Sequence, residues 1–269
     1  MRRITIMFLA VPCLFLFADC GLESFYFLDA PVTDGHSYPT YDSSDPLSFC
    51  FRFMTAEQSE NNSQYIGSGA EFSFKGTEVY YKIYNNFNTM KSNENTIDNL
   101  NTSSTASVSA AADRLLGSFG YQPLCFTGGS DVVSETPFVA ASGTDRYVYI
   151  KLNDYGSSDD YKSSICIGDH SFDSFESASS VMEKGIAVRP VRKLDKPYGF
   201  NFNADDEDNN PLPVKDDPDV NLSETPSEEG KWYVDMYAFS SGSDTTLTPS
   251  YSRVLFLGSI TITESDYNN

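Results

Sequence analysis

The sequence has little positive charge, few histidines and a single tryptophan. Its 269 residues include 18 Lys and Arg against 38 Asp and Glu, which gives a net charge of -20, and only 2 His. Binding to a phosphate backbone needs clustered Lys and Arg, so we expect no nucleic-acid partner. A folded surface of this charge is not attracted to acidic lipid headgroups either. Any contact with a membrane must come from another part of the chain.

Motifs for several common activities are also absent. The chain has no Gly-x-Gly-x-x-Gly, no phosphate-binding Gly-Lys-Ser/Thr loop, no His-Glu-x-x-His and no Gly-x-Ser-x-Gly. These absences argue against nucleotide binding, zinc-peptidase activity and an exposed serine nucleophile. His36 and His170 both lie in turn-like segments, and we interpret them as solvated. We predict no enzymatic activity and no cofactor, with a glycosidase-type hydrolase using paired Asp and Glu as the alternative.

A long apolar run occurs at the start of the chain. Arg2 and Arg3 precede an apolar-rich run over residues 4–17, followed by Leu16-Phe17-Ala18-Asp19-Cys20-Gly21. A run of this length is typical of a secretory signal and is short for a membrane-spanning helix. The sequence therefore predicts export, with residues 1–19 removed. Removal of Arg2, Arg3 and Asp19 leaves the rest of the chain more acidic still.

The segment that ends at Cys20 resembles the lipobox of bacterial lipoproteins, those of spirochaetes in particular. Phe17 and Asp19 stand where Leu and a small residue are usual. The resemblance implies that Cys20 is acylated and becomes the new N-terminus, so that the protein is anchored by lipid to the cell envelope, at the outer membrane or the cell surface. Several acyl chains anchor a protein stably, whereas one alone is marginal. Cleavage after Ala18, which releases a soluble secreted protein, is the alternative.

Most of the remaining chain has the pattern of β-strands. Residues 20–46 contain three prolines and are interpreted as a lipidated tether with an edge strand. A β-domain is predicted over residues 47–269. Apolar residues alternate over 47–54, and further strands are expected at 71–75, 78–84, 147–152, 164–167, 185–189, 232–239 and 254–263. The segments 147–152 and 164–167 are expected to form a hairpin.

Three segments differ from this β pattern. Residues 85–103 are rich in Asn and Ser and are predicted to be a loop or a mobile insertion. Apolar residues recur from Val108 to Leu116 at helical spacing and predict one short helix that ends at Gly117. Residues 203–230 hold ten acidic residues and four prolines, so we expect an extended, solvated loop.

Two strand segments resemble fibronectin type III domains. Trp232-x-Val234-x-Met236-x-Ala238, followed by Gly242, is similar to the penultimate strand of that fold, and residues 76–84 are similar to its central third strand. The resemblance implies an all-β fold, an antiparallel sandwich of the fibronectin type III or immunoglobulin kind. The two segments are far apart in the sequence, so the sandwich requires a large insertion, at about residues 85–185, that contains the one short helix.

The acidic loop offers a weak candidate for calcium binding. Its oxygen-bearing residues follow the alternate spacing of a calcium loop, although Pro211 stands at the position that requires Gly. The candidate ligands are Asp206, Asp208, Asn210 and Asp217. A solvated spacer is the stronger interpretation, and no metal site is predicted.

Three cysteines remain in the chain after Cys20. Cys50, Cys125 and Cys166 each lie in a short apolar run. Export to an oxidising compartment would allow one disulfide among the three. Three buried free thiols that pack as small apolar side chains are the other interpretation.

Together these patterns predict a non-enzymatic, lipid-anchored protein that binds a protein or glycan ligand or serves as a structural spacer. Tyrosines on the predicted strands could present a platform for a sugar, although strand tyrosines more often pack against neighbouring strands. These tyrosines are Tyr80, Tyr81, Tyr84, Tyr147, Tyr149, Tyr233 and Tyr237.

Overall fold

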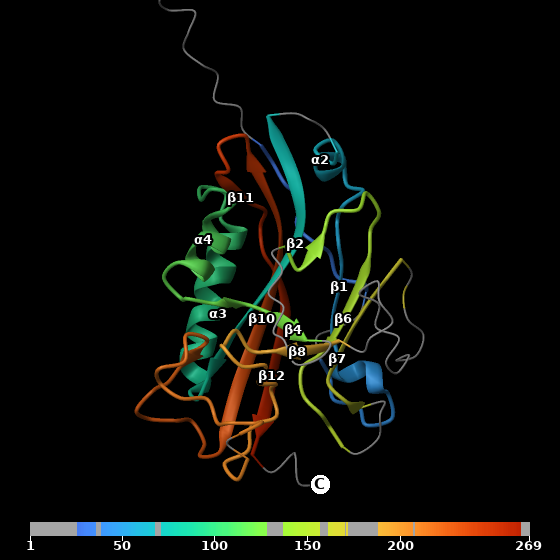
Figure 1. The fold of residues 1–269 in the computed structure, drawn as a ribbon. Coiled ribbons are helices and arrows are strands. Elements are labelled where there is room, and N and C mark those ends of the chain that lie inside the picture. The colour runs from blue at the N-terminus through green and yellow to red at the C-terminus, as the bar shows by residue number, and fades with distance from the viewer. Residues whose placement is uncertain are drawn as a thin grey trace, which may run out of the picture.

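The computed structural model describes residues 26–35, 39–67, 71–127, 137–156, 161–169, 171, 188–206 and 208–264. Two antiparallel β-sheets pack against each other, and two helices cover the outer face of the larger sheet (Figure 1). The predicted fold class, a mainly β antiparallel sandwich, is confirmed, but the insertion holds two helices where one short helix was predicted.

Two long strands form the centre of the larger sheet. β2 (Phe72–Tyr84) and β10 (Lys231–Asp244) pair antiparallel along nearly their whole length. These strands contain the two segments that resemble fibronectin type III domains. β11 (Pro249–Tyr251) and β12 (Leu255–Thr263) pair with the other edge of β10. The short strands β3 (Gln122–Pro123), β5 (Val139–Ala140) and β9 (Val220–Asn221) pair with β2.

A β-bulge in β2 changes which side chains face the core. Ser241 of β10 lies opposite Gly76, but Gly242 lies opposite Phe74, so Lys75 is an extra residue on β2. An extra residue reverses the alternation of side chains beyond it. Gly76 has a positive φ of 141°, and a Cβ there would lie 2.1 Å from the Val139 carbonyl oxygen. Glycine at this position therefore permits both the bulge and the pairing of β5.

The smaller sheet has the strand order β1-β6-β7, with β1 (Phe51–Met54), β6 (Tyr147–Lys151) and β7 (Ser164–Gly168). The predicted hairpin is confirmed as the antiparallel pair β6 and β7. The first predicted strand is shorter than expected, because residues 46–49 form the 3-10 helix η1 (Pro46–Phe49). Pro46 occupies its first turn and the Asp45 carboxylate accepts a hydrogen bond from the Leu47 amide, both of which favour a helical start.

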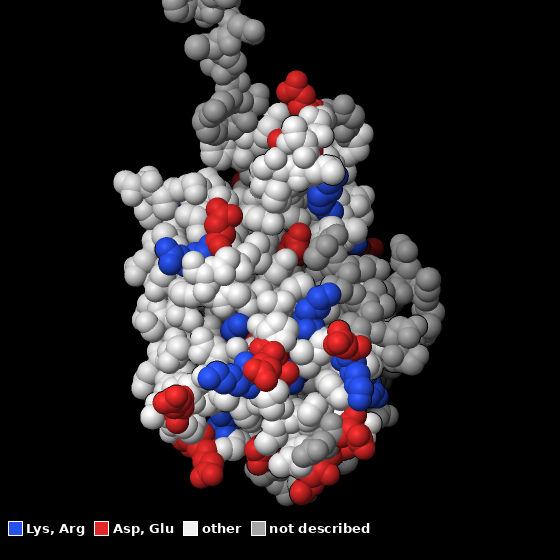
Figure 2. Space-filling view, turned by 60° about the vertical axis from the view of Figure 1, so that its left-hand side comes forward, with Lys and Arg blue, Asp and Glu red and all other residues white. Residues whose placement is uncertain are grey.

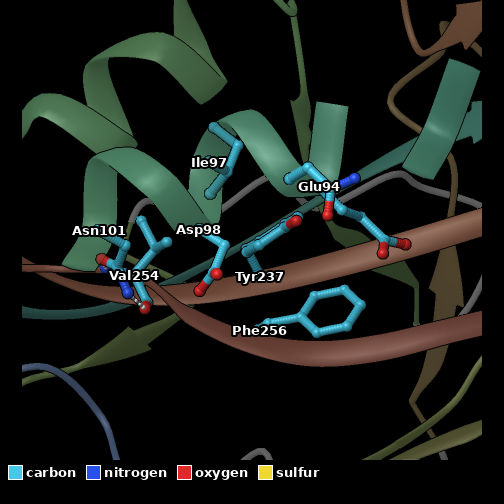
Figure 3. A pocket seen from close by; sticks show the side chains of 8 residues that line it. Glu94, Ile97, Asp98, Asn101, Tyr237, Val254 and Phe256 are labelled. Carbon is cyan, nitrogen blue, oxygen red and sulfur yellow. Dashed lines mark hydrogen bonds between the residues drawn. The ribbon is translucent and has the colours of Figure 1, made fainter. Parts of the chain in front are cut away.

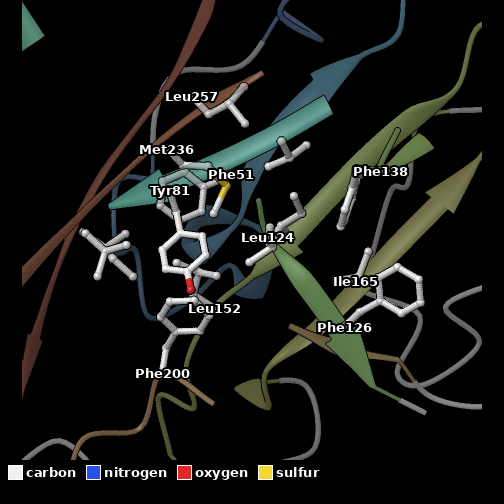
Figure 4. Close-up of a cluster of buried hydrophobic side chains, with 14 of the residues drawn as sticks. Phe51, Tyr81, Leu124, Phe126, Phe138, Leu152, Ile165, Phe200, Met236 and Leu257 are labelled. Atoms are coloured by element: carbon white, nitrogen blue, oxygen red, sulfur yellow. The ribbon is translucent and has the colours of Figure 1, made fainter. Parts of the chain in front are cut away.

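A large apolar core fills the space between the two sheets. Alternate residues of β1, β6 and β7 face alternate residues of β2, β10 and β12 across it. Figure 4 shows side chains from both sheets meeting there, among them Phe51, Tyr81, Ile165 and Met236. A separate two-stranded ribbon consists of β4 (Cys125–Thr127) paired with β8 (Arg189–Val191), and Phe126 of β4 adds to this core.

The helical layer is larger than the sequence indicated. Residues 87–102 form α3 (Phe87–Thr102), so the prediction of a loop over 85–103 was wrong. Its Asn- and Ser-rich composition has low helix propensity, and only Met90 and Ile97 are fully buried. Packing against the tyrosine-rich outer face of the larger sheet stabilises the helix, and the Asn86 side chain caps it by accepting a hydrogen bond from the Thr89 amide at 3.0 Å.

The predicted short helix is present as α4 (Ala110–Leu116) and ends at Gly117. A further single-turn helix, α2 (Glu60–Ser63), supports the start of the described chain. Its buried Asn62 donates to the Asp29 carbonyl and accepts from the Asp29 amide, both at 2.9 Å. Val32 then forms an antiparallel bridge with Met54 of β1. The range 85–185 contributes strands to both sheets in addition to the two helices α3 and α4.

The acidic segment 203–230 is not solvated throughout, which corrects the sequence prediction. Asp219 is fully buried, and its carboxylate accepts two hydrogen bonds from the guanidinium of Arg192, at 2.9 and 2.8 Å. The Tyr81 hydroxyl donates to the same carboxylate at 2.7 Å. Repulsion within the segment is therefore offset by one buried arginine, which allows β9 to pair with β2.

Candidate functional site

A cleft of about 320 Å³ lies between α3 and the strands β10 and β12 (Figure 3). Its helical side carries polar side chains, and its sheet side carries two aromatic rings. The lining residues used below are Glu94, Asp98, Asn101, Tyr237, Val254 and Phe256.

The polar side of the cleft follows from the spacing of residues on α3. Glu94, Asp98 and Asn101 occupy positions i, i+4 and i+7, which share one face of a helix. Ile97 lies between them and is buried in a separate apolar cluster between the helices and the outer face of the larger sheet. The Asn101 amide donates to the Val254 carbonyl at 2.9 Å and accepts from the Val254 amide at 2.8 Å. Asn101 therefore joins the end of α3 to the chain that leads into β12.

The floor of the cleft is an aromatic pair from neighbouring strands. Tyr237 of β10 and Phe256 of β12 are register partners, and their ring centroids are 5.0 Å apart at an interplanar angle of 42°. Burial, together with the carboxyl groups of Asp235 and Glu94, raises the pKa of Tyr237 well above its usual value. The Tyr237 hydroxyl therefore remains protonated.

The cleft carries more negative than positive charge. The Glu94 side chain is only 12% exposed, and its Oε2 accepts from the Lys91 ammonium at 2.6 Å. Its Oε1 is buried and has no hydrogen-bond partner within the described part of the chain. Asp98 is exposed at the mouth and forms no ion pair with a described residue. The exposed polar groups of the helical side are therefore the Asp98 carboxylate, which accepts hydrogen bonds, and the Asn95 amide, which both donates and accepts.

A buried polar network lies beneath this cleft. The Tyr121 hydroxyl donates to the Asp235 carboxyl at 2.5 Å, the Tyr84 and Tyr121 hydroxyls are 3.1 Å apart, and the Asn93 amide donates to Tyr84 at 3.1 Å. Burial raises the pKa of Asp235 well above its usual range, and the Glu94 carboxylate raises it further, against the opposing effect of the Tyr121 hydrogen bond.

The calcium candidates do not form one ligand set. Asp206 and Asn210 lie together in a turn, where the Asn210 amide donates to Asp206 at 2.8 Å, and Asp208 is exposed. Asp217 instead forms an ion pair with Arg192 at 2.6 Å. Across the described residues, no group of three or more His, Cys, Asp or Glu side chains is placed to hold a metal ion.

All three cysteines after Cys20 are buried free thiols in the structure. Cys50 and Cys166 belong to one apolar cluster, but β6 separates β1, which begins directly after Cys50, from β7, which holds Cys166. Strands two positions apart are about 10 Å apart. A disulfide needs Cα atoms within about 7 Å, so this pair cannot be bridged without backbone movement.

We therefore expect Cys50, Cys125 and Cys166 to resist thiol reagents in the folded protein. Burial raises the pKa of the Cys50 thiol to about 12, so the reactive thiolate is scarce at neutral pH. The measurement is reaction with a chromogenic aromatic disulfide before and after unfolding in guanidinium, without reductant. Rapid reaction of the native protein would contradict the burial of these thiols. Fewer than three of them reacting after unfolding would show that some form a disulfide.

The structure buries most of the tyrosines considered as a sugar platform. Tyr81, Tyr84, Tyr149, Tyr233 and Tyr237 are buried, and only Tyr80 and Tyr147 of this set are partly exposed, on different sheets. Cys20, His36 and His170 lie outside the described residues. Sequence reasoning missed Glu94 and Asp98 because it placed them in a loop. Their four-residue spacing, with Met90 and Ile97 seven apart, was the available signal.

Comparison with protein-family models, with curated proteins and with solved structures finds no match. Among the residues that the structure describes, no helix combines the length and the apolar character required to cross a bilayer.

Proposed function

We propose that this chain is an exported, lipid-anchored protein of the cell envelope that acts as a non-enzymatic binding module. The sequence of its first 21 residues carries the proposal, because a short basic start, an apolar run and a lipobox-like segment ending at Cys20 occur in that order. The cleft between α3 and the larger sheet is its binding site. The ligand is held on the envelope surface by the anchored domain.

The distribution of charge supports an anchor at the N-terminal end of the domain. The described chain begins at Tyr26, whose ring stacks on Phe72 at the start of β2 at 4.4 Å. The acidic segment 203–230 is held at the other end of β2, where the Ser223 amide donates to Asn85 at 2.7 Å. A strand of this length spans about 40 Å. Figure 2 shows acidic side chains gathered at the lower end of the molecule, where this segment lies in Figure 1.

An anchor near Tyr26 would therefore hold the most acidic end away from the membrane. This placement reduces repulsion by anionic headgroups, which falls off within a Debye length of about 8–10 Å. The same placement leaves the cleft on the side of the domain, where a ligand from the surroundings can reach it.

The lipid anchor is tested by intact mass and detergent partitioning of the protein from its native host. We expect cleavage before Cys20, a mass increase from acyl chains and recovery in the detergent phase, because several acyl chains bury far more methylene groups than one. A Cys20→Ser variant is the control and is expected in the aqueous phase. Recovery of an unmodified N-terminus in the aqueous phase would refute the anchor and favour a freely secreted protein.

The glycosidase alternative requires two carboxyl groups of different pKa that both face the substrate. Asp235 has the raised pKa for such a pair and Glu94 lies near it. However, Asp235 is 0% exposed and lies beneath the cleft, under the tyrosine network. The positions of Asp235 and Glu94 therefore fit a buried structural network better than they fit a hydrolytic site.

A further inference from the structure

The turn between β10 and β11 carries the most exposed of the large apolar side chains that the structure describes. Leu247 is 78% exposed, and its backbone has a positive φ of 64°. Residues with a Cβ adopt this left-handed conformation at a cost, and Gly or Asn usually occupies it in a hairpin turn. Leucine at this position therefore lowers the stability of the isolated domain through both strain and exposure. A cost of this kind is typical of functional positions.

Hydrogen bonds hold the turn in this shape. The Asp244 carboxylate oxygen Oδ1 accepts from the Thr246 and Thr248 amides, both at 2.9 Å, and from the Thr246 hydroxyl at 2.7 Å. The Leu247 amide donates to the Asp244 carbonyl at 3.0 Å. The turn residues 245–248 are three threonines and this leucine, so none of them carries a charge. The Leu247 side chain is therefore held in solvent at an uncharged tip.

The turn lies at the end of the domain where the described chain begins. The Thr245 amide donates to the Glu71 carbonyl at 3.1 Å, and the Tyr26 hydroxyl donates to the Glu71 carboxylate at 3.3 Å. The Tyr65 ring packs edge-on at 5.0 Å from Phe72, beside Tyr26. Figure 1 shows the start of β2 and the β10–β11 turn together at the upper end of the molecule. Tyr26 and Tyr65 are partly exposed, and tyrosine is enriched where proteins meet the membrane–water interface.

The length of chain before Tyr26 limits how far this end can lie from the proposed anchor. Tyr26 is six residues after Cys20, a stretch that spans at most about 20 Å. With acyl chains on Cys20, the start of the domain lies within this distance of the bilayer surface. The acidic segment 203–230 lies at the other end of β2, so the end that carries Leu247 is the one nearest the lipid.

From this arrangement we infer that the β10–β11 turn is a membrane-contact surface. Leu247 enters the boundary between headgroups and acyl chains, and Tyr26 and Tyr65 lie at the level of the headgroups. Burial of the leucine in lipid removes its exposure to water, which offsets the strain of its backbone. The inference rests on the proposed function, because the lipid anchor is what brings the bilayer to the turn.

The chemistry of this end favours a bilayer with neutral headgroups. The turn offers an apolar side chain and threonine hydroxyls, and the nearest charged groups that it contacts are the carboxylates of Asp244 and Glu71. Carboxylates are repelled by anionic headgroups. We therefore expect contact with phosphatidylcholine to be stronger than contact with phosphatidylserine.

The test is fluorescence of tryptophan variants of the full chain, reconstituted in phosphatidylcholine vesicles with or without bromine on the acyl chains. Leu247→Trp is expected to lose at least about half of its added emission in the brominated vesicles, because the side chain reaches the acyl boundary. Val214→Trp is the matched control, since Val214 is also apolar and 53% exposed but lies on the acidic segment. Its emission should not change. Trp232, which is buried in the core, gives the same baseline in both variants.

A second pair of variants assigns the contact to Leu247 itself. Tyr65→Trp places a reporter beside the turn without altering the leucine, and its quenching is expected to be lost when Leu247→Asn is added. Asn tolerates the left-handed conformation, so Leu247→Asn should also raise the unfolding temperature of the Cys20→Ser chain in the absence of lipid, by about 2–4 °C. A rise in unfolding temperature together with a loss of quenching excludes misfolding as the cause.

Each outcome either supports or overturns the inference. Equal quenching of Leu247→Trp and Val214→Trp, quenching of Tyr65→Trp that Leu247→Asn leaves unchanged, or no rise in unfolding temperature would overturn it. A blue shift of Leu247→Trp emission that grows with concentration in the Cys20→Ser chain without lipid would assign the turn to a second copy of the chain instead. The anchor is read from the mass of the N-terminus, so quenching without acylation refutes the anchor alone, and acylation without quenching refutes the membrane contact alone.

Discussion

Replacing Arg192 by methionine is expected to lower the free energy of unfolding by about 3–5 kcal/mol. The Arg192 guanidinium is fully buried and donates to both oxygens of Asp219 and, at 2.6 Å, to Asp217. Methionine keeps much of the side-chain volume but leaves the fully buried Asp219 carboxylate without its charge partner. Removing one member of a buried ion pair, which leaves the other charge uncompensated, is among the most destabilising single changes in a protein interior.

The effect of Arg192→Met is measured by guanidinium unfolding followed by the fluorescence of Trp232. Trp232 is the single tryptophan, and its ring packs 6.1 Å from that of Phe202, over which the Arg192 guanidinium lies. The control is Arg189→Met on β8, the strand that directly precedes Arg192, at an exposed position where we expect a change within about 0.5 kcal/mol. Equal stabilities of the two variants would show that the buried pair contributes little.

A double variant identifies the cause of the loss. If the cost of Arg192→Met is the stranded charge of Asp219, then Arg192→Met with Asp219→Asn should recover part of it. The same double variant still lacks the bond that ties Asp217 to Arg192. We therefore expect it to remain less stable than the natural sequence, with a looser acidic segment 203–230 that limited proteolysis detects.

Asp235 is expected to make the stability of the fold depend on pH. Its carboxyl is fully buried, and its pKa in the folded protein is raised by burial above its value in the unfolded chain, which is about 3.9. The folded state therefore binds this proton more tightly. The contribution of Asp235 to stability is complete below the unfolded pKa and is lost as the pH rises through the folded pKa. The natural protein should lose stability from about pH 4 upward relative to a variant that cannot ionise there.

Two substitutions at Asp235 separate its charge from its hydrogen bond. Asp235→Asn keeps an acceptor for the Tyr121 hydroxyl and is expected to remove this pH dependence, becoming the more stable protein at about pH 8. Asp235→Ala removes the acceptor of the Tyr121 hydroxyl and leaves a cavity, and is expected to cost about 2–4 kcal/mol.

The measurement is guanidinium unfolding of each variant across pH 4 to 8. Asp208→Asn, which makes the same charge change on the exposed segment, should keep the pH profile of the natural protein. The neighbouring groups Glu94, Lys91 and Tyr121 also contribute to the local field, but they are the same in all variants. Parallel pH profiles for Asp235→Asn and the natural protein would refute the raised pKa.

Several elements of the fold could be predicted from local pattern alone. Residues 147–152 and 164–167 alternate in polarity over short runs and form the expected hairpin, and the strands expected at 232–239 and 254–263 pair as β10 and β12. One face of each of these strands lies in the core between the sheets, so apolar residues recur at every second position of the sequence. The end of α4 at Gly117 was predictable for a similar reason, because the cap is a local signal.

The elements that sequence reasoning missed depend on contacts between distant residues. Nothing in the polar segment 87–102 favours a helix strongly, and α3 is stabilised by packing on the tyrosine-rich face formed by β2 and β10. The acidic residues of segment 203–230 repel one another in an isolated chain. In the fold, Asp217 and Asp219 pair with Arg192, which directly follows the strand β8, and Glu228 pairs with Lys231. The cleft also depends on these contacts, because its two sides come from α3 and from strands about 140 residues later.

The sequence by itself determined that the chain is acidic, that it is mainly β, and that two arginines and an apolar run precede Cys20. These properties depend on composition and short-range periodicity. Only the tertiary structure decided which carboxylates are buried and paired, as Asp219 is, and which form no ion pair within the described part of the chain, as is the case for Asp98. Burial and charge pairing are set by residues distant in sequence, because the energy of a charge depends on everything that the folded chain places around it.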